Sequence, residues 1–409
     1  MRYIKRAMEE TFKAINQEYA CILMTGPRQV GKTTMLQKLM AEEARGRAYV
    51  TLDDLELRKL AKNEPATFFQ LHKPPLFIDE VQYAPELFPY IKMWVDEHHN
   101  PGDFWLTGSQ IFKLMRGVQE SLAGRVALLQ MLPLSQQEIL GNQTVPFEVN
   151  FDALVHRQAS IAPAEMPEIY RRIFQGGMPA LLSGQYTDTR AVYSSYVSTY
   201  IDRDIKELSG TVDSLKFMGF ITASAALAGQ MVNVRTIAEN CGIDQSTAKN
   251  WLGILETLGI IFYLHPYSNN VLKRTVKKPK LYFYDTGLVC YLTKWSSAQT
   301  LMNGAMSGAI LENFAVSEIV KSYFNCGREP FAYYYRNKDA VEIDLILEGD
   351  GNLYPVEIKK TASPDIRITR AFNAISASPL QRGTGAVVCT AAKLSAFDRD
   401  NLIIPIGLI

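Results

Sequence analysis

Residues 26–33 read Gly26-Pro27-Arg28-Gln29-Val30-Gly31-Lys32-Thr33. An apolar run, residues 19–25, comes directly before them, and residues 33–45 have the apolar spacing of a helix. A glycine-rich turn between a strand and a helix lets backbone N–H groups surround phosphate oxygens, and the helix N-terminus adds a positive dipole. A chance turn is the alternative, but the flanking strand and helix favour a phosphate-binding loop. Lys32 is then expected at the β- and γ-phosphates of ATP and the Thr33 hydroxyl on Mg²⁺.

Two carboxylates end the apolar run of residues 75–80, and a hydroxyl follows the next strand candidate. Acids at the end of a buried strand are costly unless they do chemistry, although exposed strand-end acids are the alternative. We expect Asp79 to hold Mg²⁺, directly or through water, and Glu80 to polarise the attacking water. Such a pair favours hydrolysis of ATP over transfer to a small acceptor. Ser109 could touch the γ-phosphate or the water, or belong to an ordinary turn.

Five strand-like runs in the first part of the chain are separated by helical stretches. They cover residues 19–25, 47–52, 76–81, 104–107 and 126–132. Strands alternating with helices predict an α/β fold, with a parallel sheet covered on both faces.

Composition excludes several classes of protein. The 409 residues have a net charge of only +1, so any nucleic-acid binding must come from a local basic patch. The five cysteines form no CxxC pair, which argues against a disulfide scaffold or a zinc site. No run approaches the roughly 20 apolar residues that span a bilayer, and residues 1–18 have no apolar leader. We expect a cytoplasmic protein that does not enter membranes.

The middle of the chain has the pattern of a winged helix-turn-helix. Residues 141–167 are expected to be a connector, and residues 189–208 form a long amphipathic stretch. Residues 234–258 predict two helices that turn at Gly242, with Asp244 capping the second helix. Residues 260–284 predict a hairpin wing, whose basic side chains are Lys273, Arg274, Lys277, Lys278 and Lys280. This region could contact DNA, and docking to a protein remains an alternative.

Four polar residues stand out in the strand-rich C-terminal part. Glu357 and Lys359 share one strand face because they are two residues apart, and Asp344 on a neighbouring strand could meet them. Glu312, on a predicted helix, could add a third acid. Two of the carboxylates could hold a second Mg²⁺ with Lys359 activating water, and a surface strand with an ion pair is the alternative.

The chain resembles the AAA+ ATPases, and within them a prokaryotic group that joins an ATPase to a C-terminal domain of unknown function. The matching segments are residues 26–34, 76–82, 106–109, 121–125, 176–179, 200–205, 282–288, 308–318 and 356–359. The resemblance implies a sheet order of 5-1-4-3-2, a helical lid and a ring of subunits with ATP between them. It also implies that Thr34 belongs to the nucleotide site. By the same resemblance, Ser109 is expected to be the sensor 1 residue of this family and Arg125 the residue that reaches a neighbour's γ-phosphate. Pro179 is expected to contact the nucleotide from the lid.

Two further expectations follow from resemblance. An obvious lid arginine is missing, and Arg171 and Arg172 are the nearby candidates. Glu312, Asp344, Glu357 and Lys359 resemble the polar set of the PD-(D/E)XK restriction-endonuclease-like core.

These observations predict four units: an ATPase core in residues 1–140, a lid with connecting helices in 141–210, a winged helix in 211–285 and a nuclease-like domain in 286–409. The predicted function is Mg²⁺-dependent ATP hydrolysis at intersubunit sites of a homo-oligomer, a hexamer-like ring, coupled to a DNA-associated module that resembles a nuclease. The alternative is an ATP-dependent switch or scaffold whose C-terminal half binds a protein without cleavage.

Overall fold

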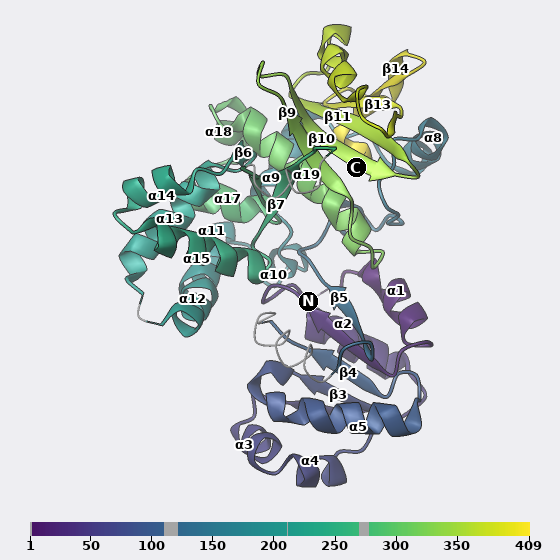
Figure 1. The fold of residues 1–409 in the computed structure, drawn as a ribbon, viewed down its shortest axis with the longest axis vertical. Coiled ribbons are helices and arrows are strands. Elements are labelled where there is room, and N and C mark those ends of the chain that lie inside the picture. The colour runs from purple at the N-terminus through teal and green to yellow at the C-terminus, as the bar shows by residue number, and fades with distance from the viewer. Residues whose placement is uncertain (1, 110–121, 211, 270–277) are drawn as a thin grey trace.

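The computed structural model describes residues 2–109, 122–210, 212–269 and 278–409. An N-terminal α/β region, a helical middle region and a C-terminal region built on a second sheet follow one another along the chain (Figure 1). In the described parts, no helix is both long and apolar enough to cross a membrane.

The N-terminal region holds a parallel sheet with the predicted order. Its strands are β1 (Cys21–Thr25), β2 (Ala48–Thr51), β3 (Leu76–Asp79), β4 (Phe104–Thr107) and β5 (Val126–Gln130). They pair in the order β2-β3-β4-β1-β5, and every pairing is parallel. The predicted order 5-1-4-3-2 is confirmed. Because parallel strands end at one edge, the loops after β1, β3 and β4 meet there.

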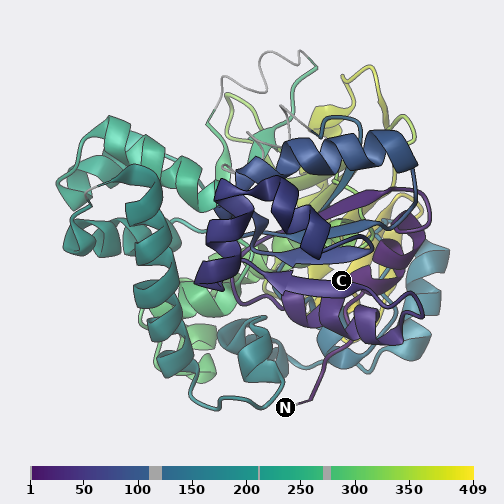
Figure 2. The same ribbon diagram turned by 90° about the horizontal axis from the view of Figure 1, so that it is seen from below.

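Helices cover both faces of this sheet, because its central strands are apolar on both sides. Phe12 of α1 (Met8–Ile15) and Leu36 of α2 (Lys32–Glu42) pack against one face with Ile22 and Trp105. The other face is covered by α3 (Leu55–Asn63), α4 (Pro65–Leu71) and α5 (Phe88–His98). Full burial of each large side chain stabilises the fold by about 1.5–3 kcal/mol. The view in Figure 2 looks onto this region, with the middle helices beside it.

The middle region begins with short helices. They are α7 (Gln136–Leu140), α8 (Phe151–Ser160), α9 (Met166–Gln175), α10 (Pro179–Leu182), α11 (Thr189–Ser195), a π-helical segment (Tyr196–Ile201) and α12 (Asp202–Ser209). Residues 141–167, expected to be a connector, contain the helix α8. Asn150 accepts a hydrogen bond of 3.1 Å from the backbone N–H of Ala153, which caps the helix, and Leu154 is buried.

A helix, a strand, two helices and a hairpin follow in that order. They are α13 (Ser214–Ala226), β6 (Gln230–Met231), α14 (Val234–Cys241), α15 (Gln245–Thr257), β7 (Ile261–Pro266) and β8 (Lys280–Phe283). Gly242 has a positive φ of 61° at the turn between α14 and α15. Asp244 stands at the N-cap position of α15 but makes no side-chain capping bond, contrary to the prediction. β8 pairs antiparallel with both β6 and β7.

The C-terminal region continues the same sheet. Its elements are α17 (Thr286–Leu292), α18 (Ala298–Asn303), α19 (Ser307–Phe324), β9 (Ala332–Arg336), β10 (Glu342–Gly349), β11 (Asn352–Lys359), the 3₁₀ helix η4 (Ile366–Ile375), β12 (Gln381–Arg382), β13 (Gly385–Cys389), β14 (Ser395–Asp398) and β15 (Asn401–Pro405). β7 pairs with β9, so one sheet runs β14-β15-β13-β11-β10-β9-β7-β8-β6. The predicted boundary between residues 285 and 286 therefore separates segments that contribute strands to one sheet.

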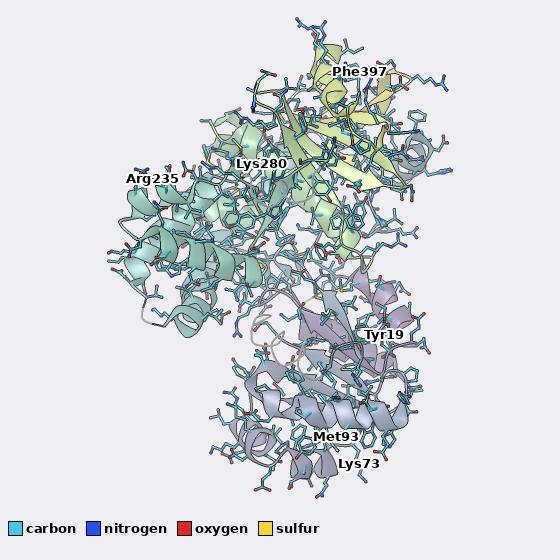
Figure 3. All side chains as sticks on the ribbon, in the orientation of Figure 1. Tyr19, Lys73, Met93, Arg235, Lys280 and Phe397 are labelled. Carbon is cyan, nitrogen blue, oxygen red and sulfur yellow. The ribbon has the colours of Figure 1, made fainter. Side chains whose placement is uncertain are left out.

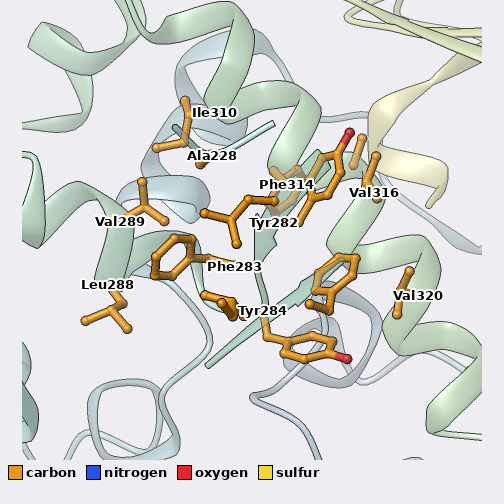
Figure 4. Close-up of a cluster of buried hydrophobic side chains, with 14 of the residues drawn as sticks. Ala228, Tyr282, Phe283, Tyr284, Leu288, Val289, Ile310, Phe314, Val316 and Val320 are labelled. Carbon is orange, nitrogen blue, oxygen red and sulfur yellow. The ribbon is translucent and has the colours of Figure 1, made fainter. Parts of the chain in front are cut away.

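The core of this region forms around β8 and α19. Tyr282, Phe283 and Tyr284 lie among Val289 and Phe314 (Figure 4). Leu281, Tyr282 and Phe283, whose apolar and aromatic side chains predicted a strand here, are buried on both faces of β8. The middle and C-terminal regions therefore share one hydrophobic core.

Candidate nucleotide site and C-terminal ionic cluster

The glycine-rich loop has backbone geometry that only glycine satisfies easily. Gly26 has φ 131°, and a Cβ there would lie 2.0 Å from the Met131 carbonyl oxygen. Gly31 has φ 94° and precedes the first residue of α2. The loop is also supported from below, because the buried Arg6 donates to the Val30 carbonyl at 2.7 Å and to Glu138 at 2.8 Å. Sequence reasoning missed Arg6.

Lys32 is held inside the loop. Its Nζ donates hydrogen bonds to the carbonyl oxygens of Gly26 at 2.9 Å and Pro27 at 2.7 Å. Burial disfavours the ammonium and lowers the pKa of Lys32 to about 8. The cation therefore lies where the loop curls, as the motif predicts, whereas the Thr34 side chain is exposed on α2.

Thr33 and Asp79 meet, as predicted. The Thr33 hydroxyl donates to Asp79 Oδ1 at 2.8 Å, and the Thr107 hydroxyl donates to the same oxygen. The Tyr49 hydroxyl donates to Oδ2 at 3.2 Å. Burial raises the pKa of Asp79. A hydroxyl beside a carboxylate is an oxygen donor set that suits Mg²⁺ together with phosphates and water.

Glu80 and Ser109 also meet at this sheet edge. Glu80 has a positive φ of 56° directly after β3. Its Oε2 accepts a bond of 3.3 Å from the Ser109 hydroxyl and a second bond from the Gln82 amide. Its backbone N–H donates to the Thr107 hydroxyl at 3.2 Å. Sequence reasoning did not assign Gln82, Tyr49 or Thr107 a role: Thr107 ends β4, Gln82 comes three residues after β3, and Tyr49 lies within β2.

Arg125 lies on the surface and has a partner in its own chain. Its guanidinium forms a two-pronged ion pair with Asp96 of α5, in which Nη2 and Oδ2 are 3.0 Å apart. Exposed pairs of this kind contribute little to stability, because water and salt screen the two charges. Arg125 donates hydrogen bonds to Asp96 and to the Ala123 carbonyl, both within its own chain. Its action on a neighbouring subunit stays a prediction.

The expected lid residues contact other parts of the chain. The Gly177 N–H donates to Asp285 Oδ2 at 2.8 Å, and its carbonyl accepts from Leu134 at 2.9 Å, just before Pro179 begins α10. Arg171 and Arg172 both bond to Glu168, at 2.6 and 2.7 Å. The structure thus gives these arginines a local partner, and a nucleotide contact by Pro179 stays a prediction.

Two phosphate-loop residues touch the middle region. Arg28 forms a bidentate pair with Asp204 of α12, with Nε–Oδ2 at 2.9 Å and Nη2–Oδ1 at 3.1 Å. At the end of α15, a Cβ added to Gly259 would lie 3.0 Å from Cδ of Pro27. The middle region therefore contacts the phosphate loop directly, at Arg28 and Pro27. Sequence resemblance pointed to residues 200–205 without giving Asp204 a partner.

Two of the four C-terminal polar residues, Glu312 and Asp344, lie beside a lysine that the sequence analysis had placed in an exposed wing. Lys280 is buried and lies 3.0 Å from Glu312, 2.7 Å from Glu342 and 3.7 Å from Asp344. Its expected role in an exposed wing patch is therefore wrong. Figure 3 labels Lys280 at the junction between the middle helices and the C-terminal sheet. The expected wing residues Lys273, Arg274 and Lys277 lie outside the described residues, and Lys278 is exposed.

Lys359 completes this cluster on the far side of Asp344. Lys359 Nζ lies 2.6 Å from Glu357 and 3.2 Å from Asp344, whose Oδ2 also accepts from the Ile358 N–H at 2.9 Å. Burial, then the Asp344 charge, raises the pKa of Glu357 to about 9, and burial raises that of Glu312 to about 7. Burial opposes ionisation of Asp344, but the two lysines outweigh it and lower its pKa. Within the described chain, no group of three His, Cys, Asp or Glu is placed to hold a metal.

Comparison with known families adds to this geometry. Residues 18–140 match the family described as "AAA domain". The match and the parallel sheet support an AAA-type ATPase domain. Residues 166–299 and 307–409 match two families, each described as a domain of unknown function. A C-terminal domain of unknown function was expected, and this match says nothing of a nuclease.

Similar proteins are found in bacteria and archaea. An uncharacterized protein of Mycobacterium tuberculosis is 28% identical over 346 residues, which covers 84% of this chain and 71% of the relative. An uncharacterized protein of Methanocaldococcus jannaschii is 23% identical over 340 residues, which covers 80% of this chain and 71% of the relative. Among solved structures, a Walker-type ATPase of Pyrococcus abyssi has a TM-score of 0.45 at 14% identity. The match covers 71% of this chain and 96% of the ATPase. The RuvB Holliday junction branch migration motor of Thermotoga maritima has a TM-score of 0.30 at 15% identity. The match covers 62% of this chain and 86% of the motor protein.

Proposed function

We propose that this protein hydrolyses ATP with Mg²⁺ at the edge of its N-terminal sheet. One observation carries the proposal: two pairs, Thr33 with Asp79 and Glu80 with Ser109, form within the same edge, directly beyond the glycine-rich loop. Backbone N–H groups of the loop and the Lys32 ammonium would hold the phosphates. Thr33 and Asp79 would hold Mg²⁺, which supplies positive charge at the β- and γ-phosphates.

Glu80 is the residue that orients the attacking water. Both donors, Ser109 and Gln82, reach its Oε2, so the carboxylate is fixed in one orientation. The other carboxylate oxygen would accept a proton from water, which increases its nucleophilicity. The positive φ of Glu80 turns its side chain out of the strand direction. Removing this base is expected to slow hydrolysis by about 10²- to 10⁴-fold.

The test is phosphate release by purified protein with ATP and Mg²⁺. Lys32→Ala should abolish nucleotide-dependent turnover, because it removes the cation from the phosphate loop. Lys38→Ala is the matched control, since Lys38 lies on the same helix and pairs with Glu9 and Glu42 at 3.0 and 2.8 Å. Equal turnover in the Lys32→Ala and Lys38→Ala proteins contradicts the proposal.

We further propose that active protein is a homo-oligomer, a hexamer-like ring in which Arg125 completes a neighbour's site. The exposure of Arg125 supports this role, because a residue that acts in trans must reach beyond its own surface. Its bond to Asp96 is of the weak surface kind, so a γ-phosphate can replace that partner at little cost.

Nucleic acid, with DNA as the first candidate, is the proposed partner of the middle and C-terminal regions. The order α13-β6-α14-α15-β7-β8 supports this partner, because a winged helix would have its helices and hairpin in this order. Beside it lies a cleft of about 860 Å³ whose charged lining residues are Lys278, Arg336 and Lys338, with no carboxylate among the described residues that line it. Tyr335 also lines it and could stack on a base.

A non-cleaving switch is the second candidate function, favoured by the position of Lys280. Its ammonium fills the space among Glu312, Glu342 and Asp344, where a nuclease-like core would need a metal ion. In this alternative, ATP controls assembly and the C-terminal region binds a partner without cutting it. Metal-dependent cutting of DNA that Asp344→Ala abolishes would instead support a nuclease.

A further inference from the structure

The side chain of Arg28 links the phosphate loop to α12. Arg28 is the third residue of the loop, and its guanidinium meets both carboxylate oxygens of Asp204. The side chains are only 12% and 4% exposed, so water screens the pair poorly. Burial disfavours the Arg28 cation, but the bonds to Asp204 outweigh this and raise its pKa. This is a buried, geometrically matched pair, unlike the surface pairs elsewhere on the chain.

Both charges of the pair act on the phosphate site. The Arg28 charge disfavours the Lys32 ammonium, and the Asp204 and Glu80 charges favour it. Asp204 therefore lies within electrostatic reach of the place where the triphosphate would sit. Bound ATP would bring negative charge towards Asp204 and would offer Arg28 phosphate oxygens, which suit a guanidinium as well as a carboxylate does.

A second contact ties the loop to the same region. The backbone at Gly259 packs on Pro27, the residue beside Arg28. α12 and α15 themselves pack together. Any movement of Pro27 and Arg28 on nucleotide binding would therefore change two contacts with the middle region, those at Asp204 and Gly259.

We propose that Asp204 is a positioning residue that holds Arg28 away from the nucleotide, and that the γ-phosphate of ATP competes with Asp204 for the Arg28 guanidinium. This inference rests on the proposed ATP site. When the γ-phosphate of ATP binds Arg28, the Arg28–Asp204 pair opens and α12 loses this contact with the loop. When only ADP remains, the pair closes again, because the competing γ-phosphate is gone. The middle region thereby distinguishes ATP from ADP.

The experiment measures affinity for fluorescent mant-ATP and mant-ADP in the presence of Mg²⁺. Asp204→Asn should tighten mant-ATP binding by about 5-fold or more, the scale of a coupling free energy between sites, while mant-ADP affinity changes less than about 2-fold. Asp204→Glu, which keeps the charge, should restore the wild-type ratio. Asp244→Asn, at an exposed position of the same region, is the control and should leave both affinities unchanged.

A double-mutant cycle shows whether the effect passes through Arg28. In the Arg28→Ala background, Asp204→Asn should no longer change the ATP/ADP affinity ratio, because the competing group is absent. The inference is overturned if Asp204→Asn changes both affinities equally, or if its effect persists without Arg28. A merely structural Asp204 would lower the Tm of the protein without altering that ratio.

A glycine pair keeps the inference testable if Asp204→Asn fails to fold. Gly259 and Gly242 both have positive φ, 69° and 61°, so Ala strains both backbones similarly, but only Gly259 has Pro27 beside it. Gly259→Ala should alter mant-ATP affinity and Gly242→Ala should not; equal affinities in the two variants would overturn the coupling. Lys32→Ala distinguishes failure of the proposed ATP site from failure of the coupling through Arg28. If Lys32→Ala still binds mant-ATP, the proposed site fails; if binding is lost but Asp204→Asn has no selective effect, only this inference fails.

Discussion

The Thr33 hydroxyl donates a hydrogen bond of 2.8 Å to Oδ1 of Asp79. This bond joins the first turn of α2 to the end of β3, two segments that are distant in sequence. Oxygen atoms from both residues thereby face the end of the phosphate loop. Such a hydroxyl–carboxylate pair is suited to a hydrated Mg²⁺ that also binds the β- and γ-phosphates.

Asp79→Asn should raise the Mg²⁺ concentration that half-maximal ATP hydrolysis requires by about 10- to 100-fold, the usual cost of losing a partner of a metal site. The amide lacks the negative charge that attracts the cation. The measurement is turnover against Mg²⁺ at saturating ATP. Tyr49→Phe removes only the 3.2 Å hydroxyl bond to Oδ2 and should have a much smaller effect. An unchanged Mg²⁺ requirement in Asp79→Asn would show that the carboxylate does not serve the metal.

Arg125→Ala should reduce turnover while mant-ATP affinity stays nearly constant, because the residue would act on a neighbour's nucleotide. Mixing Arg125→Ala with Glu80→Gln subunits should restore part of the activity at interfaces that combine two intact halves. Arg367→Ala is the control, since Arg367 is another exposed arginine paired with a carboxylate, that of Asp365. Normal turnover of Arg125→Ala at high protein concentration would exclude Arg125 as the residue that acts in trans.

Glu357 predicts a specific dependence of stability on pH. Its pKa is about 9 in the fold, against an ordinary value of 4.5, so the folded chain binds this proton more tightly than the unfolded chain does. The stabilisation is fully present below about pH 4.5 and is lost as pH rises towards 9. Urea unfolding at several pH values should show wild type losing more than about 1 kcal/mol across this window relative to Glu357→Gln.

An exposed carboxylate of the same region, Glu329, provides the control for this measurement. Glu329→Gln should follow the wild-type pH profile. Parallel profiles for wild type and Glu357→Gln would mean that the Glu357 carboxyl does not keep its proton in the fold.

The cleft beside β9 predicts the salt dependence of nucleic-acid binding. Lys278→Ala and Lys338→Ala should each reduce the slope of log affinity against log salt by about one, as one phosphate contact is lost. Fluorescence anisotropy with a labelled oligonucleotide measures this slope. Lys249→Ala tests the rival surface, because Lys249 is exposed on α15. A smaller slope in Lys249→Ala alone would place binding on that helix and not in the cleft.

Local sequence patterns pointed to side chains that the fold brings together, because Lys32 and Thr33 follow β1 and Asp79 ends β3. Lys32, Thr33 and Asp79 sit at fixed positions relative to β1 and β3, so the parallel sheet brings them together. The strand order itself came from a resemblance to a family, since periodicity does not reveal which strands are neighbours.

Contacts between side chains that are distant in the chain could not be predicted from the sequence. Lys280 resembled a wing lysine because its neighbours are basic, yet the pairing of β7 with β9 brings it to the acids of β10 and α19. Asp204 likewise gave no local sign that it pairs with Arg28. Such contacts depend on tertiary packing, to which no short-range pattern points.

The most direct test of the proposed catalytic site is single-turnover hydrolysis of ATP by Glu80→Gln. We expect this variant to bind mant-ATP as wild type does and to hydrolyse ATP at least about 10²-fold more slowly, because Gln cannot accept a proton from the attacking water. Glu86→Gln, an exposed carboxylate in the segment that follows β3, serves as the control and should hydrolyse ATP at the wild-type rate. Hydrolysis by Glu80→Gln at the rate of the Glu86→Gln protein would contradict the assignment of this sheet edge as the catalytic site.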